Sequence, residues 1–409
     1  MGKPDYGKFF ASRVNYMYPS PVREAVAKIA YKSKIKPIIS FAAGEPDPEV
    51  LPRDIYANLA AEIFRKVPKI VNYAPAEGVL DLREEIAKFM KEYEGVETTY
   101  EKVIVTVGGS QALDIVARVL LEPGDIVITE NPSYVNTLLC WRHYGVQLTG
   151  VEMDEKGMRT DKLEEKIKEL KNKGRLIKLI YTIPTGQNPS GITMNLERRK
   201  HLLEIASKYD VLVVEDTAYN HLVYEEIPVK PLRSMDKEGR VIYAGSFSKV
   251  LGTGLRVGWL EAPEEVIEKV RYSKQPMDMC APVPSQYIVL EVLRRKMFRD
   301  IKMRAIEAYK HKRDLMLKAL DTHLPELKHT KPVAGMFILL WLPEKMESYA
   351  FADALLEKYD VAVIPAARFF LGEEGRNVIR LNFSMAKPNL IDEGVKRIAK
   401  LVGELAEQV

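Results

Sequence analysis

The chain has 409 residues, of which 46% are hydrophobic and 29% are charged. This composition can build a large core and excludes a disordered chain. At about 150 residues per domain, the length predicts two to three domains. The 61 lysines and arginines nearly balance the 57 aspartates and glutamates, which leaves a net charge of +4. We therefore expect no nucleic-acid partner, because proteins that bind nucleic acid carry a patch or stripe of excess positive charge.

The cysteines and histidines give no support for a metal site. Cys140 and Cys280 are too few for a disulfide framework or a four-thiolate site, and the 6 histidines lack metal-ligand spacing. The N-terminal sequence has no signal-peptide pattern, and no window approaches 18 uncharged apolar residues, so we expect no membrane partner. These features predict a cytoplasmic protein with reduced thiols. Abundant lysine and glutamate indicate a thermophilic source.

Most of the chain repeats one local pattern. Residues 1–45 are expected to form an extended arm and a short helix, and after them a β-rich apolar run, a turn and a helical pattern recur. The clearest expected strands are 103–107, 125–129, 176–184, 211–216 and 240–247. Continuous apolar strands that alternate with helices are typical of an α/β domain with a mostly parallel sheet buried on both faces.

The pattern changes to a long helix over residues 283–320, and the short strands and helices after it predict a smaller α+β domain. We therefore expect three parts. Residues 1–45 form an arm or lid that contributes to the small domain, 46–300 form the large domain, and 301–409 form the small C-terminal domain.

Polar residues that follow the expected strands are candidate site residues, because ligands of open α/β sheets bind beyond the carboxyl ends of the strands. Ser110 and Gln111 follow a glycine pair that opens a helix, which forms either a phosphate seat or a plain tight turn. Asp216 ends an apolar run, where a carboxylate either caps a helix or faces a cationic ring nitrogen. Lys249 lies among hydroxyls and glycines after another strand, where burial would lower its pKa and make its amine a nucleophile.

Seven segments in chain order resemble those of the fold type I pyridoxal-phosphate enzymes, specifically the aspartate-aminotransferase-like class I and II aminotransferases. The segments are YAPAEGVLDLR (73–83), GSQ (109–111), NPSY (131–134), QNPSG (187–191), DTAY (216–219), SFSK (246–249) with RVG (256–258), and RLNF (380–383). The resemblance implies a large domain with a mostly parallel seven-stranded sheet and a smaller α+β domain. It also implies a pyridoxal 5'-phosphate cofactor that is covalently bound to Lys249.

The same resemblance implies a role for each matching residue around the cofactor ring. Asp216 would keep the pyridine nitrogen protonated, and Tyr134 would stack on the ring. Asn188 and Tyr219 would hydrogen-bond the ring hydroxyl. Lys249 would also carry a proton during the reaction, so the expected catalytic residues are Lys249, Asp216 and Tyr219.

The cofactor phosphate is expected to bind backbone N–H groups, hydroxyls and one guanidinium. The residues that carry these groups are Ser110, Gln111, Ser246, Ser248 and Arg256. Tyr73 would reach the phosphate from the neighbouring chain, so we expect a homodimer.

Two N-terminal segments, SPVR (20–23) and FAAGEPDP (41–48), look most like the kynurenine/2-aminoadipate and multi-substrate aminotransferase subgroup. In that subgroup the N-terminal segment covers the active site. The expected substrate-binding residues are Arg380, which would clamp the α-carboxylate, together with Asn188, Gly44 and Arg23. Arg23 either meets a second substrate carboxylate or is a solvent-exposed helix charge.

We therefore predict a ping-pong aminotransferase that acts through Lys249. Its donor would be an aromatic, kynurenine-like or 2-aminoadipate-type amino acid, and its acceptor a 2-oxo acid, namely 2-oxoglutarate. Thr253, Gln187 and Ser190 depart from the commoner family residues. The alternatives are a lyase similar to 1-aminocyclopropane-1-carboxylate synthases, an aminotransferase specific for alanine or branched-chain donors, and a cofactor-binding protein that would tolerate loss of Lys249. A transcription regulator would need a winged helix-turn-helix before residue 40, which we do not expect.

Overall fold

The computed structural model describes residues 3–228 and 230–407. Its largest sheet has eight strands in the spatial order β2-β9-β8-β7-β6-β3-β4-β5. These strands are β2 (Val103–Val107), β3 (Ile126–Asn131), β4 (Gln147–Asp154), β5 (Gly157–Met158), β6 (Ile177–Thr182), β7 (Leu212–Asp216), β8 (Val241–Ser246) and β9 (Val257–Glu261). The five strands from β4 to β8 in this order are parallel, whereas β9 is antiparallel to both its neighbours. The predicted α/β class is confirmed, and β5 adds a short edge strand to the seven strands expected.

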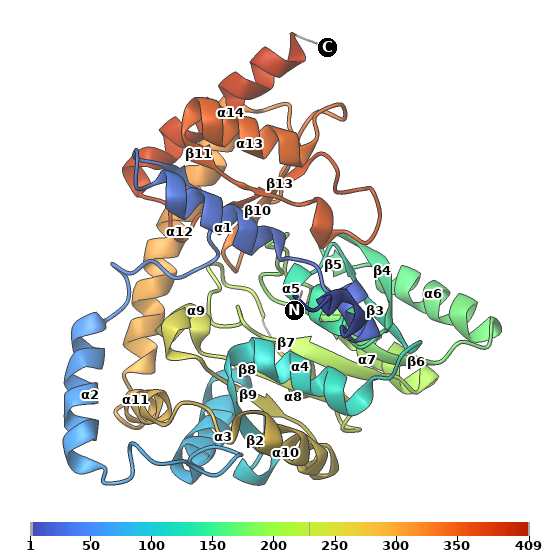
Figure 1. Cartoon of the computed structure of the whole chain (residues 1–409), viewed down its shortest axis with the longest axis vertical. Coiled ribbons are helices and arrows are strands. Elements are labelled where there is room, and N and C mark those ends of the chain that lie inside the picture. Colours follow the sequence, from blue (N-terminus) through green and yellow to red (C-terminus); the bar gives the residue numbers. More distant parts are fainter. Residues whose placement is uncertain (1–2, 229, 408–409) are drawn as a thin grey trace.

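The strands of this sheet are apolar along their length because both faces are buried. Ile126 and Ile128 of β3 belong to one hydrophobic cluster, whereas Val127 between them belongs to another. Successive side chains of a strand point to opposite faces, so each cluster covers one face of the sheet. The helices around the sheet are α3 (Leu80–Glu94), α4 (Gly108–Leu120), α5 (Val135–Arg142), α6 (Thr160–Asn172), α7 (Leu196–Tyr209), α8 (Leu232–Met235), α9 (Ser248–Leu251) and α10 (Glu264–Asp278), whereas α2 (Arg53–Lys66) lies farther from the sheet (Figure 1).

A smaller α+β layer lies at the other end of the molecule (Figure 1). Its antiparallel sheet has the order β10-β13-β12. The elements of this layer are β10 (Phe337–Trp341), α13 (Ser348–Tyr359), β11 (Val361–Ala362), β12 (Ile364–Pro365), β13 (Val378–Asn382) and α14 (Pro388–Ala406). The chain also returns here from its beginning, since β1 (Ile39–Ser40) pairs in parallel with β11.

The N-terminal helix α1 (Pro21–Lys32) packs against this smaller layer. Lys28 Nζ forms an ion pair with Asp353 at 2.9 Å, and Lys32 Nζ donates to the Leu356 carbonyl at 3.1 Å. These contacts hold the second half of α1 against α13 of the smaller layer. No helix within residues 3–228 and 230–407 is long and apolar enough to span a membrane.

The single helix predicted over residues 283–320 is wrong, because the structure has two helices there. They are α11 (Val283–Arg294) and α12 (Phe298–His323). Lys296 adopts a left-handed φ of 56° between them, and Met297 N donates to the Val292 carbonyl at 3.0 Å, which closes the end of α11. The domain limits predicted from sequence stay predictions. The predicted limit at residue 300 falls inside α12, which extends from the large domain to the smaller layer (Figure 1).

Candidate active site

A cavity of about 350 Å³ lies between the carboxyl ends of the large sheet, the smaller layer and α1. Strand polarity explains its position, because β7 and β8 are parallel neighbours and end at Asp216 and Ser246 respectively. The cavity is lined by twelve of the residues predicted from sequence: Arg23, Gly44, Ser110, Tyr134, Asn188, Asp216, Tyr219, Ser246, Ser248, Lys249, Arg256 and Arg380.

Lys249 points its amine into this cavity from α9. Its Nζ donates a hydrogen bond to the Gly44 carbonyl at 2.7 Å and lies 5.8 Å from the centre of the Tyr219 ring. Desolvation by burial lowers the pKa of Lys249 to about 8, although the nearby Glu45 acts in the opposite direction. A buried amine with a lowered pKa is the state that a nucleophilic lysine requires.

Asp216 is a buried carboxylate at the mouth of β7, with 6% of its surface exposed. Tyr181 Oη donates to its Oδ2 at 2.9 Å, and burial raises the pKa of Asp216. A buried charge that lacks a counterion is costly, so a cationic group in the cavity would stabilise the ionised form. Sequence reasoning missed Tyr181, because its place within the apolar strand β6 indicated only a core residue.

The turn from β2 into α4 lies against Arg256. Gly108 has a φ of +72°, and a Cβ at this position would lie 2.6 Å from Arg256 Nη2. Arg256 Nη2 in turn donates to the Val107 carbonyl at 2.9 Å. The start of α4, the Ser246 and Ser248 hydroxyls and this guanidinium therefore form one electropositive corner of the cavity.

Gln111 is one of two predicted cofactor-binding residues that do not line the cavity. Its Oε1 accepts from Val107 N at 2.7 Å, and its Nε2 donates to Asp278 at 2.6 Å. The Gln111 side chain thus stabilises the turn between β2 and α4 from the side that faces away from the cavity.

Arg380 reaches the opposite side of the cavity from β13 and is 2% exposed. Its Nη1 donates to Asn188 Oδ1 at 3.0 Å, and its Nη2 donates to the Ala42 carbonyl at 3.1 Å. The guanidinium lies 4.2 Å from the Phe337 ring centre, and its Nε has no hydrogen-bond partner in the described part of the chain. Burial lowers the pKa of Arg380 to about 10, so an incoming carboxylate would stabilise this buried cation.

Asn188 and Tyr134 form hydrogen bonds that link the cavity lining to Tyr219 and to the segment before α1. Asn188 Nδ2 donates to Tyr219 Oη at 3.3 Å. Tyr134 Oη accepts from Asn136 Nδ2 at 3.0 Å, and Asn136 Oδ1 accepts from Ser20 Oγ at 2.8 Å, one residue before α1. Sequence reasoning did not select Asn136 or Ser20 individually, because neither belongs to a motif position with an obvious chemical role.

Tyr73 does not line the cavity of its own chain, and 79% of its surface is exposed. An exposed tyrosine next to Val71, which is 78% exposed, leaves an apolar surface facing solvent in a single chain. The predicted approach of Tyr73 to a neighbouring subunit stays a prediction.

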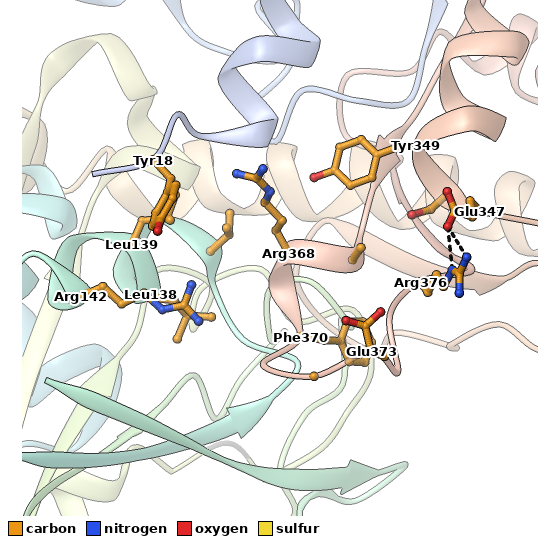
Figure 2. A pocket seen from close by; sticks show the side chains of 14 residues that line it. Tyr18, Leu138, Leu139, Arg142, Glu347, Tyr349, Arg368, Phe370, Glu373 and Arg376 are labelled. Atoms are coloured by element: carbon orange, nitrogen blue, oxygen red, sulfur yellow. Dashed lines mark hydrogen bonds and ion pairs between the residues drawn. The ribbon is translucent and has the colours of Figure 1, made fainter. Parts of the chain in front are cut away.

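A second, larger hollow lies between α5 and the smaller layer and has a volume of about 480 Å³. It is lined by Tyr18, Arg142 and Arg368, and an ion pair between Glu347 and Arg376 at 2.5 Å lies at its edge (Figure 2). None of the predicted site residues lines it, so size alone does not locate the chemistry. Within residues 3–228 and 230–407, no cluster of His, Cys, Asp or Glu could hold a metal ion.

Comparison with known proteins gives the family. The model of the aminotransferase class I and II family matches residues 36–398. The chain belongs to this family. It is a fold type I aminotransferase that depends on pyridoxal phosphate, which confirms the predicted enzyme class and cofactor. The residues present fit the cofactor, because the cavity offers a lysine amine, a buried carboxylate and an electropositive corner for a phosphate.

Three relatives show how widely this aminotransferase resembles characterised members. It is 38% identical over 402 residues to aromatic-amino-acid aminotransferase 1 of Thermococcus litoralis, covering 98% of this chain and 95% of the relative. It is 36% identical over 375 residues to 2-aminoadipate transaminase of Thermus thermophilus, and this match covers 90% of this chain and 91% of the relative. The crystal structure of an archaeal alanine:glyoxylate aminotransferase superposes with a TM-score of 0.96 at 52% identity. The match covers 98% of this chain and 100% of the chain in that structure.

Proposed function

We propose that the 350 Å³ cavity is the active site of this aminotransferase and that Lys249 carries the cofactor and moves the substrate proton. The observation that supports this most is the meeting of the Lys249 amine, the Asp216 carboxylate and the Arg380 guanidinium in one cavity. Pyridoxal phosphate, when bound, supplies an electron-withdrawing ring that accepts the electron pair released at the substrate Cα.

The surrounding residues prepare this chemistry by charge and position. Asp216, held by Tyr181, would keep a ring nitrogen protonated, and Tyr134 would pack against the ring face. Asn188 and Tyr219 would hydrogen-bond the ring hydroxyl. Gly109, Ser110, the serine hydroxyls and Arg256 would hold the phosphate.

Substrate binding depends on Arg380 at the α-carboxylate end. Its guanidinium would orient the Cα–H bond toward Lys249, which takes the proton as a base and returns it as an acid. Lys249 with its pKa near 8 suits this double role at neutral pH. Gly44 lies beside the amine, and a larger residue does not fit there, because a Cβ would lie 2.7 Å from the Phe337 ring.

The donors we propose are aromatic, kynurenine-like and 2-aminoadipate-type amino acids, with 2-oxoglutarate as acceptor. The aromatic and 2-aminoadipate enzymes among the relatives support the donors. Arg23 on α1 lines the cavity and is available for a second carboxylate. A second candidate is transfer from alanine to glyoxylate, which the 52% identity to the alanine:glyoxylate enzyme favours.

A panel of half-reactions distinguishes these candidates. The protein with bound cofactor is mixed with each amino acid alone, and the conversion of the cofactor to its amino form is followed by absorbance. Fast conversion by aromatic donors and 2-aminoadipate, with reversal by 2-oxoglutarate, supports the first candidate. Conversion by alanine alone and reversal by glyoxylate alone supports the second, and no conversion by any amino acid contradicts both.

We further propose a cytoplasmic homodimer from a thermophilic source. The exposed Tyr73, Val71 and Met279, the last 54% exposed, support an interface with a second copy. The thermophilic source is supported by surface ion-pair networks such as Lys166 and Lys173 on Glu169, at 2.6 and 2.7 Å.

A further inference from the structure

Glu130 is a buried carboxylate that the proposed mechanism does not use. It lies near the end of β3 and is 1% exposed. Its oxygens accept hydrogen bonds from Thr182 Oγ1 at 2.5 Å, from Ile183 N at 3.1 Å and from Gln187 Nε2 at 3.2 Å. Within the described part of the chain it forms no ion pair, so hydrogen-bond donors alone stabilise its carboxylate form. Burial raises the pKa of Glu130 to about 7, and the bond from Thr182 opposes that rise.

Gln187 connects Glu130 by hydrogen bonds to two loops beside the cavity. It is fully buried, and its Nε2 also donates to the Pro132 carbonyl at 2.7 Å. Its Oε1 accepts from Ser190 N at 2.9 Å and from Ser190 Oγ at 2.6 Å. Every polar atom of the Gln187 side chain is therefore engaged, and its orientation is determined from both ends.

The two loops joined in this way carry two residues of the proposed active site. Pro132 is two residues before Tyr134, and Gln187 directly precedes Asn188. Asn188 donates to Tyr219 Oη and accepts from Arg380, so its rotation affects both the cofactor side and the substrate side.

We propose that Glu130 and Gln187 are positioning residues for transamination, which hold Asn188 in the rotamer that contacts Tyr219 and Arg380 together. This inference rests on the proposed function of the cavity. Three donors fix the position of the Glu130 carboxyl group, and their hydrogen bonds are strongest in its ionised form, because bonds to an ionised acceptor are stronger than those between neutral groups. Glu130 and Gln187 act through Asn188 and touch neither substrate nor cofactor.

The test compares Gln187→Ala and Glu130→Gln with a matched control, Glu215→Gln. Glu215 is also a buried carboxylate, accepts from Leu232 N at 2.8 Å and Arg233 N at 2.9 Å, and does not line the cavity. We expect both test variants to lower kcat/KM by roughly 10²-fold, the effect of a displacement near 1 Å in an active site. We also expect them to shift the midpoint of the pH titration of the bound-cofactor absorbance, which depends on the hydrogen bonds from Asn188 and Tyr219. The control should lose thermal stability without that shift.

A double-variant cycle keeps the test valid if Glu130→Gln folds poorly. If Gln187 acts through Asn188, adding Gln187→Ala to Asn188→Ala should cause almost no further loss of kcat/KM. Fully additive losses, or an unshifted absorbance titration in Gln187→Ala, would overturn the proposal. Failure of the proposed function is distinguishable, because then the unmodified protein itself shows no bound-cofactor absorbance and no half-reaction.

Discussion

Lys249 Nζ donates a hydrogen bond to the Gly44 carbonyl at 2.7 Å, although 205 positions separate the two residues in sequence. The contact joins the short helix after β8 to the segment that leads from β1 into the large domain. It places the amine where the N-terminal segment, the large sheet and the smaller layer meet. Since Glu45 follows Gly44, the same segment also brings a carboxylate near the amine and partly offsets the effect of burial on its pKa.

The first prediction concerns the pH dependence of cofactor uptake. Only the unprotonated amine attacks an aldehyde, so uptake of pyridoxal phosphate by the cofactor-free protein should become faster as the pH rises. Burial lowers the pKa of Lys249 from 10.5 to about 8, so the rise should have its midpoint near pH 8. Stopped-flow absorbance measures the rate. A midpoint near pH 10.5 would show that the amine is solvated like an ordinary lysine.

The second prediction concerns Arg380. Arg380→Lys should keep a positive charge but lose the planar pair of donors that matches a carboxylate. Arg380→Ala should in addition leave Asn188 Oδ1 and the Ala42 carbonyl without their donor. Truncating one partner of a buried charged pair costs about 2–5 kcal/mol, so kcat/KM should fall about 30-fold or more for every amino donor. An unchanged kcat/KM for Arg380→Ala would remove Arg380 from the substrate site.

The third prediction concerns Arg23 and separates dicarboxylic from aromatic substrates. Arg23→Ala should raise KM for 2-aminoadipate and 2-oxoglutarate, because it removes the proposed partner of their second carboxylate, and should leave aromatic donors almost unaffected. Lys28→Ala on the same helix is the matched control, since Lys28 pairs with Asp353 and does not line the cavity. Equal effects of both variants on all substrates would mean that Arg23 acts only as a helix charge.

The fold and the site differ in how much the sequence predicts. Continuous apolar runs predict the buried parallel strands correctly. A strand in such a sheet is buried on both faces, so apolar residues are favoured at every position along it. The polar residues placed after those strands meet in one cavity for the same topological reason. Lys296 was missed as a helix break because the left-handed conformation there is not marked by glycine. Tyr181 and Glu130 were missed because only the three-dimensional neighbours of a buried polar group reveal what it binds.

The fourth prediction concerns the exposed Tyr73 and the proposed dimer. Tyr73→Ala should bind the cofactor more weakly, and Lys249→Ala should be inactive. Mixed dimers of the two variants should regain activity, because one of their two sites combines an intact Lys249 with an intact Tyr73 from the other subunit. Activity of the re-associated mixture measures this gain. If mixing restores nothing, Tyr73 does not act across an interface.

The central claim is that Lys249 is the cofactor-bearing and proton-transferring residue of an aminotransferase. The most direct measurement is the single-turnover half-reaction of Lys249→Ala, loaded with pyridoxal phosphate and mixed with a donor amino acid of the unmodified protein. We predict a changed cofactor absorbance before mixing, because no covalent bond to the protein can form, and at most residual conversion to the amino form afterwards. Conversion at the rate of the unmodified protein would contradict the account.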